Sequence, residues 1–296
     1  LKNKKLTLKI DNIVNKNPCF FYEDNFQLDK IRKIIINGDF PYIPIINKNN
    51  KLVNIIDPKS LGKELIKKKI DLPVVIMAGG KGTRLQPSTH ILPKPLIPIK
   101  GKAIIEHIIH EFSNYGIHNY YVSINYKSIM IKAFFSELNG DYKIKYITEK
   151  KPLGTAGSLK LLEKNKRENF IVINCDTIIK TDFSDFIKFH KKNKNDISVI
   201  SSMNKLEIPY GVCEIDKNQK LKKIDEKPKI NFLANTGCYL INKKVIKLIP
   251  KNKYYDFTDL ISLAIKKKYK VGVYPINKNE WIDAGSLDYI NSVNEL

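Results

Sequence analysis

A glycine-rich loop that ends in an arginine is the first part of the sequence whose residue types could do chemistry. The apolar run PVVIMA, residues 73–78, leads directly into GGKGTRL, residues 79–85. Because glycine lacks a Cβ, such a loop lets a ligand approach the backbone closely, and its N–H groups can surround a phosphate. Arg84 adds a permanent cation that can hold two phosphate oxygens at once. The loop therefore predicts a phosphate-binding site at the end of a strand.

The two common phosphate-binding motifs do not describe this loop. A P-loop requires GxxxxGK[ST], and no stretch of the sequence matches it. The dinucleotide fingerprint GxGxxG is met by Gly80 and Gly82, but its third position is Leu85. Taken alone, the loop could also be a glycine turn beside a solvated arginine.

A second cation, Lys94, follows Arg84 in the segment ILPKPLIPI, residues 91–99. The three prolines of this segment restrict its backbone, so the lysine is carried on a stiff piece of chain. A lone lysine in a proline-rich loop is usually solvated. Beside a loop already shaped for phosphates, however, a second cation has a clear use.

Two aspartates offer oxygen ligands. Asp176 ends the run FIVINCD, at the carboxyl end of a predicted strand, where open α/β sheets bind their ligands. Asp283 lies in WIDAGS near the end of the chain. A small number of carboxylates suits Mg²⁺ when phosphates and waters complete its coordination. Either aspartate alone is more often a helix cap or a turn residue.

The elements that must position these residues alternate between strands and helices after Leu72. Strands are predicted at residues 74–78, 120–124, 144–148, 170–174 and 197–201, and helices at 103–115, 128–138, 157–165 and 183–192. This alternation predicts a mostly parallel sheet with helices on both faces, followed by hairpin-like strands beyond Tyr210.

Residues 1–70 differ in character and predict a small α+β unit. Its predicted strands cover residues 19–22, 42–46 and 52–56, and its predicted helices cover 26–37 and 58–69. The polar run Asn47–Asn50 predicts a turn between the last two strands.

Composition excludes several classes of function. The net charge of +22 comes almost entirely from lysines scattered through every segment, with only three arginines, so we expect no nucleic-acid partner. No apolar run approaches the roughly 18 residues of a membrane span, and no signal peptide is evident, so we expect no membrane partner. The four cysteines form no CxxC pair, which is typical of a reducing compartment and predicts a cytoplasmic protein without a zinc site.

Together, MAGGKGTRLQP and LPKPLIPI closely resemble the signature of the sugar-1-phosphate nucleotidyltransferases. These enzymes join a nucleoside triphosphate to a sugar-1-phosphate and release pyrophosphate. The resemblance runs from about Leu72 to Leu296 and implies a Rossmann-like catalytic domain over 71–296 that uses Mg²⁺. Since a sugar phosphate has a second pKa of about 6, its oxygen is already nucleophilic at neutral pH, and no Ser/His/Asp set is required.

The resemblance also implies the roles of particular residues. Arg84, Lys94 and Asp176 would be catalytic, and Asp176 and Asp283 would coordinate Mg²⁺, although Cys175 stands where the family usually has glycine. The nucleotide would contact Ala78, Gly79, Gly80, Gly82, Thr83, Glu149, Gly154 and Thr155. The sugar phosphate would contact Tyr210, Gly211, Glu226, Lys227, Asn235 and Gly237.

The base and the sugar are predicted from two further likenesses. The segment EKKPLGTAGSL, residues 149–159, resembles the base-recognition loop of mannose-1-phosphate guanylyltransferases, which favours GTP, although uridylyl enzymes differ little there. The segment FPYIPIINKNNKLVNIID, residues 40–57, resembles one CBS module within 17–70. Guanylyltransferases of the bacterial legionaminic acid pathway join such modules to this catalytic domain and use glucosamine-1-phosphate.

Several alternatives stay open at this point. The enzyme could instead be a mannose- or heptose-1-phosphate guanylyltransferase, or a uridylyl- or thymidylyltransferase. A catalytically inactive nucleotide-binding regulatory subunit is the alternative from another class, but such a protein would be expected to lose Arg84, Lys94 or an aspartate. The CBS-like unit departs from its family's pattern at Asn54, so a packing or homo-oligomer role is as consistent with it as adenosine binding.

Overall fold

The structure is a computed structural model that describes residues 20–22, 43–56, 69–138 and 140–286. The chain divides into two units, Leu1–Lys67 and Lys68–Leu296. Within the described residues, no helix combines the length and the apolar character that a membrane crossing requires.

The described part of the first unit is a three-stranded sheet. Strand β1 (Phe21–Tyr22) runs parallel to β2 (Ile43–Ile46), which pairs antiparallel with β3 (Leu52–Ile56). The side-chain oxygen of Asn47 accepts hydrogen bonds from the N–H groups of Asn49 and Lys51, both at 3.0 Å, which closes the predicted polar turn. The predicted strands are therefore confirmed, whereas the predicted helices at 26–37 and 58–69 fall outside the described residues except for Lys69, which is not helical.

The second unit is built on a seven-stranded sheet with the order β15-β11-β14-β9-β4-β7-β8. Strand β14 runs antiparallel to both of its neighbours, and the other strands share one direction. The strands are β4 (Val74–Met77), β7 (Asn119–Ile124), β8 (Lys143–Thr148), β9 (Asn169–Asn174), β11 (Ile197–Glu207), β14 (Lys229–Asn242) and β15 (Val271–Ile276). The prediction of a mostly parallel sheet is confirmed.

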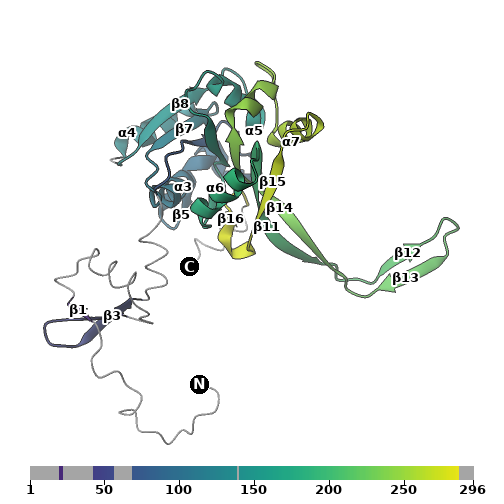
Figure 1. The fold of residues 1–296 in the computed structure, drawn as a ribbon, viewed down its shortest axis with the longest axis horizontal. Coiled ribbons are helices and arrows are strands. Elements are labelled where there is room, and N and C mark those ends of the chain that lie inside the picture. Colours follow the sequence, from purple (N-terminus) through teal and green to yellow (C-terminus); the bar gives the residue numbers. More distant parts are fainter. Residues whose placement is uncertain (1–19, 23–42, 57–68, 139, 287–296) are drawn as a thin grey trace, which may run out of the picture. The chain divides into compact units, whose positions relative to one another are not determined.

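Helices cover both faces of this sheet, as Figure 1 shows. The α-helices are α3 (Ile104–Ser113), α4 (Ser128–Glu137), α5 (Gly154–Gly157), α6 (Phe183–Lys192) and α7 (Phe257–Lys266). Short 3₁₀ turns include η2 (Thr83–Leu85), η4 (Lys94–Leu96), η5 (Ser158–Leu162), η6 (Lys243–Leu248) and η7 (Lys278–Glu280). Two small hairpins pair β5 (Pro98–Ile99) with β6 (Lys102–Ala103) and β12 (Val212–Ile215) with β13 (Leu221–Asp225).

Alternation along the central strands produces two separate hydrophobic cores. In β4, Val74 and Ile76 face a core made with α3, α4 and α6, whereas Val75 and Met77 face a core made with η5, η6 and α7. Strands buried on both faces read as continuous apolar runs, which is why VVIM contains no polar residue. This double burial holds the end of β4, and with it the glycine loop, in a fixed position.

One predicted helix and one strand boundary were wrong. Of the helix predicted at 157–165, residues Ser158–Leu162 form the 3₁₀ turn η5, and the preceding α5 is only four residues long. The strand predicted at 197–201 continues to Glu207 as β11.

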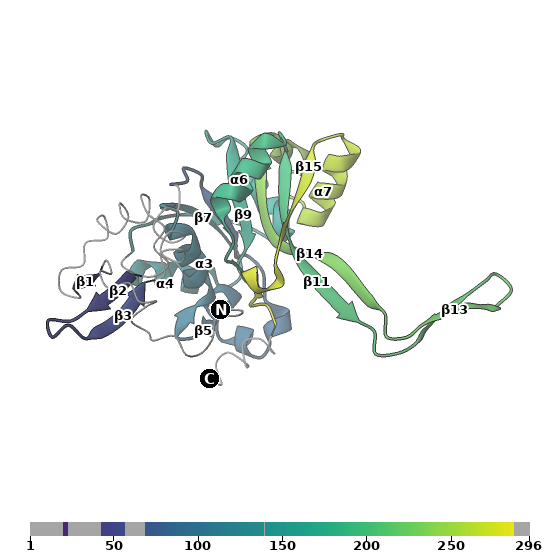
Figure 2. The same cartoon turned by 60° about the horizontal axis from the view of Figure 1, so that its bottom comes forward.

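The outer halves of β11 and β14 leave the sheet as a two-stranded ribbon, and β12 and β13 form a hairpin beyond it (Figures 1 and 2). We call residues 201–235 the arm. The burial pattern changes along both long strands, since the inner residues are buried and the outer residues are mostly exposed.

Candidate active site

The glycine loop begins where β4 ends and lines a pocket of about 420 Å³, a size typical of small-ligand sites. Gly82 has φ +66°, and a Cβ there would lie 2.9 Å from the side chain of Thr89 and 3.0 Å from that of Lys94. Gly80 has no atom near the place of a Cβ, so its backbone is open to a ligand. Glycine is therefore needed at position 82 to bring the loop against Lys94, and it leaves access at position 80.

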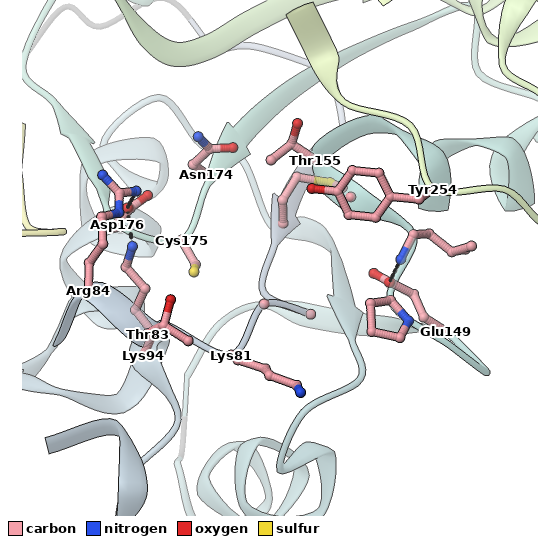
Figure 3. A pocket seen from close by; sticks show the side chains of 17 residues that line it. Lys81, Thr83, Arg84, Lys94, Glu149, Thr155, Asn174, Cys175, Asp176 and Tyr254 are labelled. Atoms are coloured by element: carbon pink, nitrogen blue, oxygen red, sulfur yellow. Dashed lines mark hydrogen bonds and ion pairs between the residues drawn. The ribbon is translucent and has the colours of Figure 1, made fainter. Parts of the chain in front are cut away.

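Arg84, Lys94 and Asp176 meet at one end of this pocket (Figure 3). The ammonium of Lys94 is bonded to Oδ2 of Asp176, and Nη2 of Arg84 lies 3.9 Å from the same oxygen. The side chains of Lys94 and Asp176 are 10% and 11% exposed, whereas that of Arg84 is 75% exposed. The two cations thus differ in setting: Lys94 is held in place by burial and an ion pair, and Arg84 projects toward solvent.

Asp283 is brought to Asp176 by a strand pair that is remote in sequence. Strand β10 (Thr177–Ile179) pairs antiparallel with β16 (Trp281–Asp283), and the N–H of Ala284 donates to the carbonyl of Asp176 at 2.8 Å. A Cβ on Gly285 would lie 2.5 Å from Oδ2 of Asp176 and 2.9 Å from Oδ1 of Asp283. The two carboxylates and the Lys94 ammonium therefore lie close together beside Gly285, where a side chain would collide with them.

Glu149 lies at the other end of the pocket and is buried. Its carboxylate accepts hydrogen bonds from the hydroxyl of Ser123 and, at 2.9 Å, from the N–H of Leu153. Burial raises the pKa of Glu149, and these two bonds partly oppose the rise. A Cβ on Gly79 would lie 2.5 Å from Oε1 of Glu149, so the glycine loop also makes room for this carboxylate.

The LGTAG segment is fixed by the start of α7. Gly154 has φ +78°, and a Cβ there would lie 2.7 Å from the carbonyl oxygen of Tyr255. The hydroxyl of Thr155 donates to Oδ1 of Asp256 at 3.1 Å and accepts from the N–H of Phe257 at 2.8 Å. Thr155 lines the pocket, but its hydroxyl is occupied in joining the loop to this helix.

The thiol of Cys175 lines the pocket between the two ends. Burial raises its pKa to about 12, so the thiol stays protonated near neutral pH and is a poor nucleophile. Cysteine is thus accommodated at this position as a small buried side chain, and the carboxylate of Asp176 still reaches Lys94.

The residues predicted for the nucleotide gather in the pocket. Ala78 is buried directly before the loop. The others line the pocket together with Arg84, Lys94 and Asp176; they are Gly79, Gly80, Gly82, Thr83, Glu149, Gly154 and Thr155.

The residues predicted for the sugar phosphate do not gather there. Gly237 and Asn235 lie at the base of the arm, where Gly237 packs against Asn174 of the pocket. Tyr210, Gly211, Glu226 and Lys227 lie at the far end of the ribbon, beyond the limits of β11 and β14.

Sequence reasoning missed Lys81, Asn174 and Tyr254, all of which line the pocket. Lys81 lies within the glycine loop and Asn174 ends the predicted strand 170–174, so both could have been included on that ground. Tyr254 comes about a hundred residues after the LGTAG segment and reaches it through the backbone bond from Tyr255 N–H to the Leu153 carbonyl, 2.9 Å long. No local sequence signal marks such a long-range pairing.

Comparisons with known proteins agree with this geometry. The family model described as nucleotidyl transferase matches residues 73–296. A UTP–glucose-1-phosphate uridylyltransferase of Synechocystis is 29% identical over 244 residues, which are 75% of this chain and 62% of that protein. A mannose-1-phosphate guanyltransferase of Yarrowia lipolytica is 35% identical over 187 residues, which are 59% of this chain and 50% of that protein. The alignments thus span half to three fifths of the length of these curated relatives.

A solved structure shares the fold of the second unit. HddC from Yersinia pseudotuberculosis, crystallised in complex with GMP-PN, is 27% identical with a TM-score of 0.58, over 76% of this chain and 98% of that one. The match of the family model covers the glycine loop, both cations and both aspartates. The chain therefore belongs to the nucleotidyl transferase family.

Proposed function

We propose that the protein transfers GMP from GTP to a sugar-1-phosphate, with glucosamine-1-phosphate as the preferred acceptor, and releases pyrophosphate. The observation that carries this proposal is the division of one pocket into two unlike ends. Arg84, Lys94 and Asp176 form an end suited to phosphates, and buried Glu149 forms an end suited to a base. The exposed backbone at Gly80 lies on the loop that joins them.

Glu149 favours guanine over uracil because of its hydrogen-bonding capacity. An ionised carboxylate accepts at about four lone-pair positions, and here Ser123 and Leu153 use two of them. Guanine presents two adjacent donors, N1–H and the 2-amino group, to which the remaining positions are complementary. Uracil presents a single N–H between two carbonyl oxygens, and these oxygens would face a negative charge. The base-reading role of Glu149 is thus supported by chemistry as well as by the likeness to guanylyltransferases.

The phosphate end supplies positioning and charge rather than acid–base catalysis. Arg84 is free to turn toward a triphosphate because its side chain is largely solvated, and its planar fork can hold two phosphate oxygens. Lys94 would contact the α-phosphate region from its buried position beside Asp176. The acceptor phosphate then attacks the α-phosphorus, the bond to the β-phosphate oxygen breaks, and pyrophosphate leaves with the electron pair of that bond. Fixed cations beside the developing charge lower the barrier to this step.

Asp176 and Asp283 are the proposed ligands of a divalent cation. Their carboxylates lie close together beside Gly285, with Lys94 bonded to Asp176 and the Gly285 N–H donating to Asp283, and hard oxygen ligands in small number are what Mg²⁺ takes when phosphates complete its coordination. Within the described ranges, no group of three or more His, Cys, Asp or Glu side chains forms a metal site, so substrate phosphates would have to complete this one. When bound, Mg²⁺ would supply further neutralisation of the phosphate oxygens.

The acceptor is proposed to contact Tyr210, Gly211, Glu226, Lys227, Asn235 and Gly237. Lys227 would pair with the sugar phosphate, and Glu226 would accept from hydroxyl groups or from the amino group of glucosamine. A positively charged amine beside Glu226 is the physical reason to place glucosamine-1-phosphate first among the candidates. Residues 1–70 are proposed as a CBS-like packing or homo-oligomer module, without a part in the chemistry.

Pyrophosphate release tests the proposed function directly. GTP, UTP, dTTP and ATP should each be combined with glucosamine-, mannose-, heptose- and glucose-1-phosphate in the presence of Mg²⁺. We expect GTP with glucosamine-1-phosphate to show the highest kcat/KM. A preference for UTP or dTTP would overturn the guanylyl assignment, and absence of turnover with every pair would favour a regulatory protein.

Glu149→Gln is predicted to reduce the preference for GTP over UTP by roughly 5- to 150-fold, because one bidentate base contact contributes about 1–3 kcal/mol of discrimination. The amide can donate to a uracil carbonyl and repels one donor of guanine. The measurement is the ratio of kcat/KM for the two nucleotides. An unchanged ratio would remove Glu149 from base recognition.

The same residue predicts a pH dependence of GTP binding. Because burial raises the pKa of Glu149, the protonated form persists to a higher pH than in an ordinary glutamate. The carboxylate is the form that accepts from guanine, so KM for GTP should rise as the pH falls through this raised pKa. The substrates also titrate at their phosphates, and the Glu149→Gln enzyme is the matched control because it shares those titrations. The difference between the pH profiles of KM for the wild-type and Glu149→Gln enzymes should therefore report the titration of Glu149 alone.

A further inference from the structure

A carboxylate just outside the nucleotide pocket holds two of the side chains that line it. Thr155 and Tyr254 line the pocket (Figure 3), whereas Asp256 does not. Oδ1 of Asp256 accepts from both the N–H and the hydroxyl of Thr155, each at 3.1 Å. The hydroxyl of Tyr254 donates to the same carboxylate, and this bond raises the pKa of Tyr254. Asp256, at the start of α7, therefore contacts the pocket wall at two points.

Thr155 returns this contact by capping α7. Its hydroxyl accepts from the N–H of Phe257, the first residue of that helix, at 2.8 Å. The first N–H groups of a helix have no partner within it, and Thr155 satisfies one of them from a distant part of the chain. Phe257 is buried, and its ring stacks on that of Tyr239 with centroids 3.6 Å apart. Thr155 is thus joined to a helix that is anchored in the core.

These bonds fix the peptide between Gly154 and Thr155. The peptide is planar and trans, so the Gly154 carbonyl points away from Asp256, to which the N–H of Thr155 donates. Gly154 has φ +78°, and a Cβ there would lie 2.9 Å from Oδ1 of Asp256, so this backbone lies directly against the carboxylate. Since Gly154 lines the pocket, Asp256 sets the orientation of backbone that a ligand would meet.

The same segment continues to Glu149 through Leu153. The N–H of Leu153 donates to the carboxylate of Glu149, and its carbonyl accepts from the N–H of Tyr255, both at 2.9 Å. Residues 153–155 therefore connect Glu149 with the start of α7. The two cations that pair with Asp176 lie at the other end of the pocket. A shift of residues 153–155 should consequently disturb the base end and leave the phosphate end in place.

We propose that Asp256 is a positioning residue for the nucleotide, which holds residues 153–155 in the orientation that the base requires. The inference rests on the proposed function for the use of a nucleoside triphosphate, but not for the choice of base. A loop that is ordered before the ligand arrives binds more tightly, because less conformational entropy is lost on binding. Loss of the Asp256 carboxylate should therefore weaken nucleotide binding while the chemical step keeps its rate.

Asp256→Ala is the test, with nucleotide Kd measured by calorimetry without acceptor and with steady-state kinetics alongside. For the nucleotide that wild type prefers, Kd and KM should rise roughly 10-fold, the lower end of what losing a hydrogen bond to a charged group costs. The kcat at saturation should change by less than about twofold. Asp256→Asn keeps an oxygen acceptor and should recover most of the lost affinity. An unchanged Kd in Asp256→Ala, or a loss confined to kcat, would overturn the proposal.

Asp182→Ala is the matched control, because Asp182 caps α6 away from the pocket. Its side chain accepts from the N–H groups of Ser184 at 2.8 Å and Asp185 at 3.4 Å. Both alanine variants should unfold at a lower temperature than wild type, since each loses contacts at a helix start. Only Asp256→Ala should bind the nucleotide more weakly. An equal rise of Kd in Asp182→Ala would assign the effect to general destabilisation, and the proposal would be wrong.

Thr155→Val extends the test and covers the case of an Asp256→Ala chain that does not fold. It is nearly isosteric, removes the hydroxyl that joins the loop to Phe257, and should also raise Kd. Because Thr155 and Asp256 act as one unit, the double variant should bind little worse than the weaker single variant. Two effects that multiply in full would contradict the pairing.

Amide hydrogen exchange without nucleotide examines the contact itself. Residues 153–157 should exchange faster in Asp256→Ala than in wild type, and unchanged exchange there would overturn the inference. The choice of nucleotide separates it from the proposed function. If wild type prefers UTP or dTTP, the guanylyl assignment is wrong, and the positioning role stands when the Kd of that nucleotide rises in Asp256→Ala. If wild type binds none of GTP, UTP, dTTP and ATP, both are wrong.

Discussion

Lys94→Ala is expected to lower kcat by about 10²–10³, which is the usual effect of losing one preorganised electrostatic contact with the transition state. Lys94 is buried on a proline-restricted turn and bonded to Asp176, so its ammonium needs little reorganisation before the reaction. KM for the nucleotide should change less than kcat, because an interaction that strengthens in the transition state contributes mainly to the rate. Steady-state kinetics with the best substrate pair provide the measurement.

Two further variants keep this prediction interpretable. Lys94→Met keeps most of the hydrocarbon stem and removes only the charge, so it should lose as much activity as Lys94→Ala while unfolding at a higher temperature. Lys188→Ala removes a solvated lysine whose partner is Asp185 on α6, and its kinetics should change by less than about twofold. An unaffected kcat in a folded Lys94→Met enzyme would exclude Lys94 from the chemical step.

Asp176→Asn is expected to lower kcat at least as far, by about 10³ or more, because two contacts lose the same charge. The carboxylate of Asp176 is bonded to Lys94, and it lies close to the carboxylate of Asp283, with which it is proposed to hold the cation. The amide keeps the size of the side chain, so the sheet and the loop should remain folded. Activity measured across a Mg²⁺ titration should stay low at every concentration.

Asp71→Asn is the matched control for this change. Asp71 also pairs with a cation, Arg167 at 2.8 Å, but its side chain is 79% exposed, and surface ion pairs contribute little. The activity of the Asp71→Asn enzyme should equal that of wild type. If the Asp176→Asn enzyme regains activity at high Mg²⁺, Asp176 affects only the affinity for the metal. Near-normal rates at all Mg²⁺ concentrations would exclude Asp176 from the active site.

The parts of the fold that could be predicted from sequence are those set by neighbouring residues. Strand β4 and the loop after it follow from a continuous apolar run that ends in glycines, and α6 follows from its apolar spacing, with the predicted bounds Phe183–Lys192. Strand β9, which ends at Asn174, pairs parallel with β4, as the predicted alternation of strands and helices leads one to expect. In these regions local preference and tertiary packing agree.

The parts that could not be predicted depend on pairings distant in sequence. Strand β14 lies between β9 and β11 and runs antiparallel to both. The residues of β14 alone do not specify this position in the sheet. Gly157–Asn165 has the composition of a helix, but the N–H groups of Ala156 and Gly157 donate to the Tyr255 carbonyl, and the chain continues as a 3₁₀ turn. For the site, the nucleotide-side residues are grouped in the pocket, whereas the placement of Tyr210 and Lys227 on a long arm depends on how far β11 and β14 remain paired.

The close fit between Gly79 and Glu149 has an evolutionary consequence. The space that a Cβ at position 79 would need is occupied by Oε1 of Glu149, which Ser123 and Leu153 hold in place. A lineage that acquired a side chain at position 79 would therefore have to move or replace the glutamate at the same time. In descendants of this chain, a side chain at position 79 is expected only with or after a change at position 149, so the route to a new nucleotide preference begins at position 149 rather than in the loop.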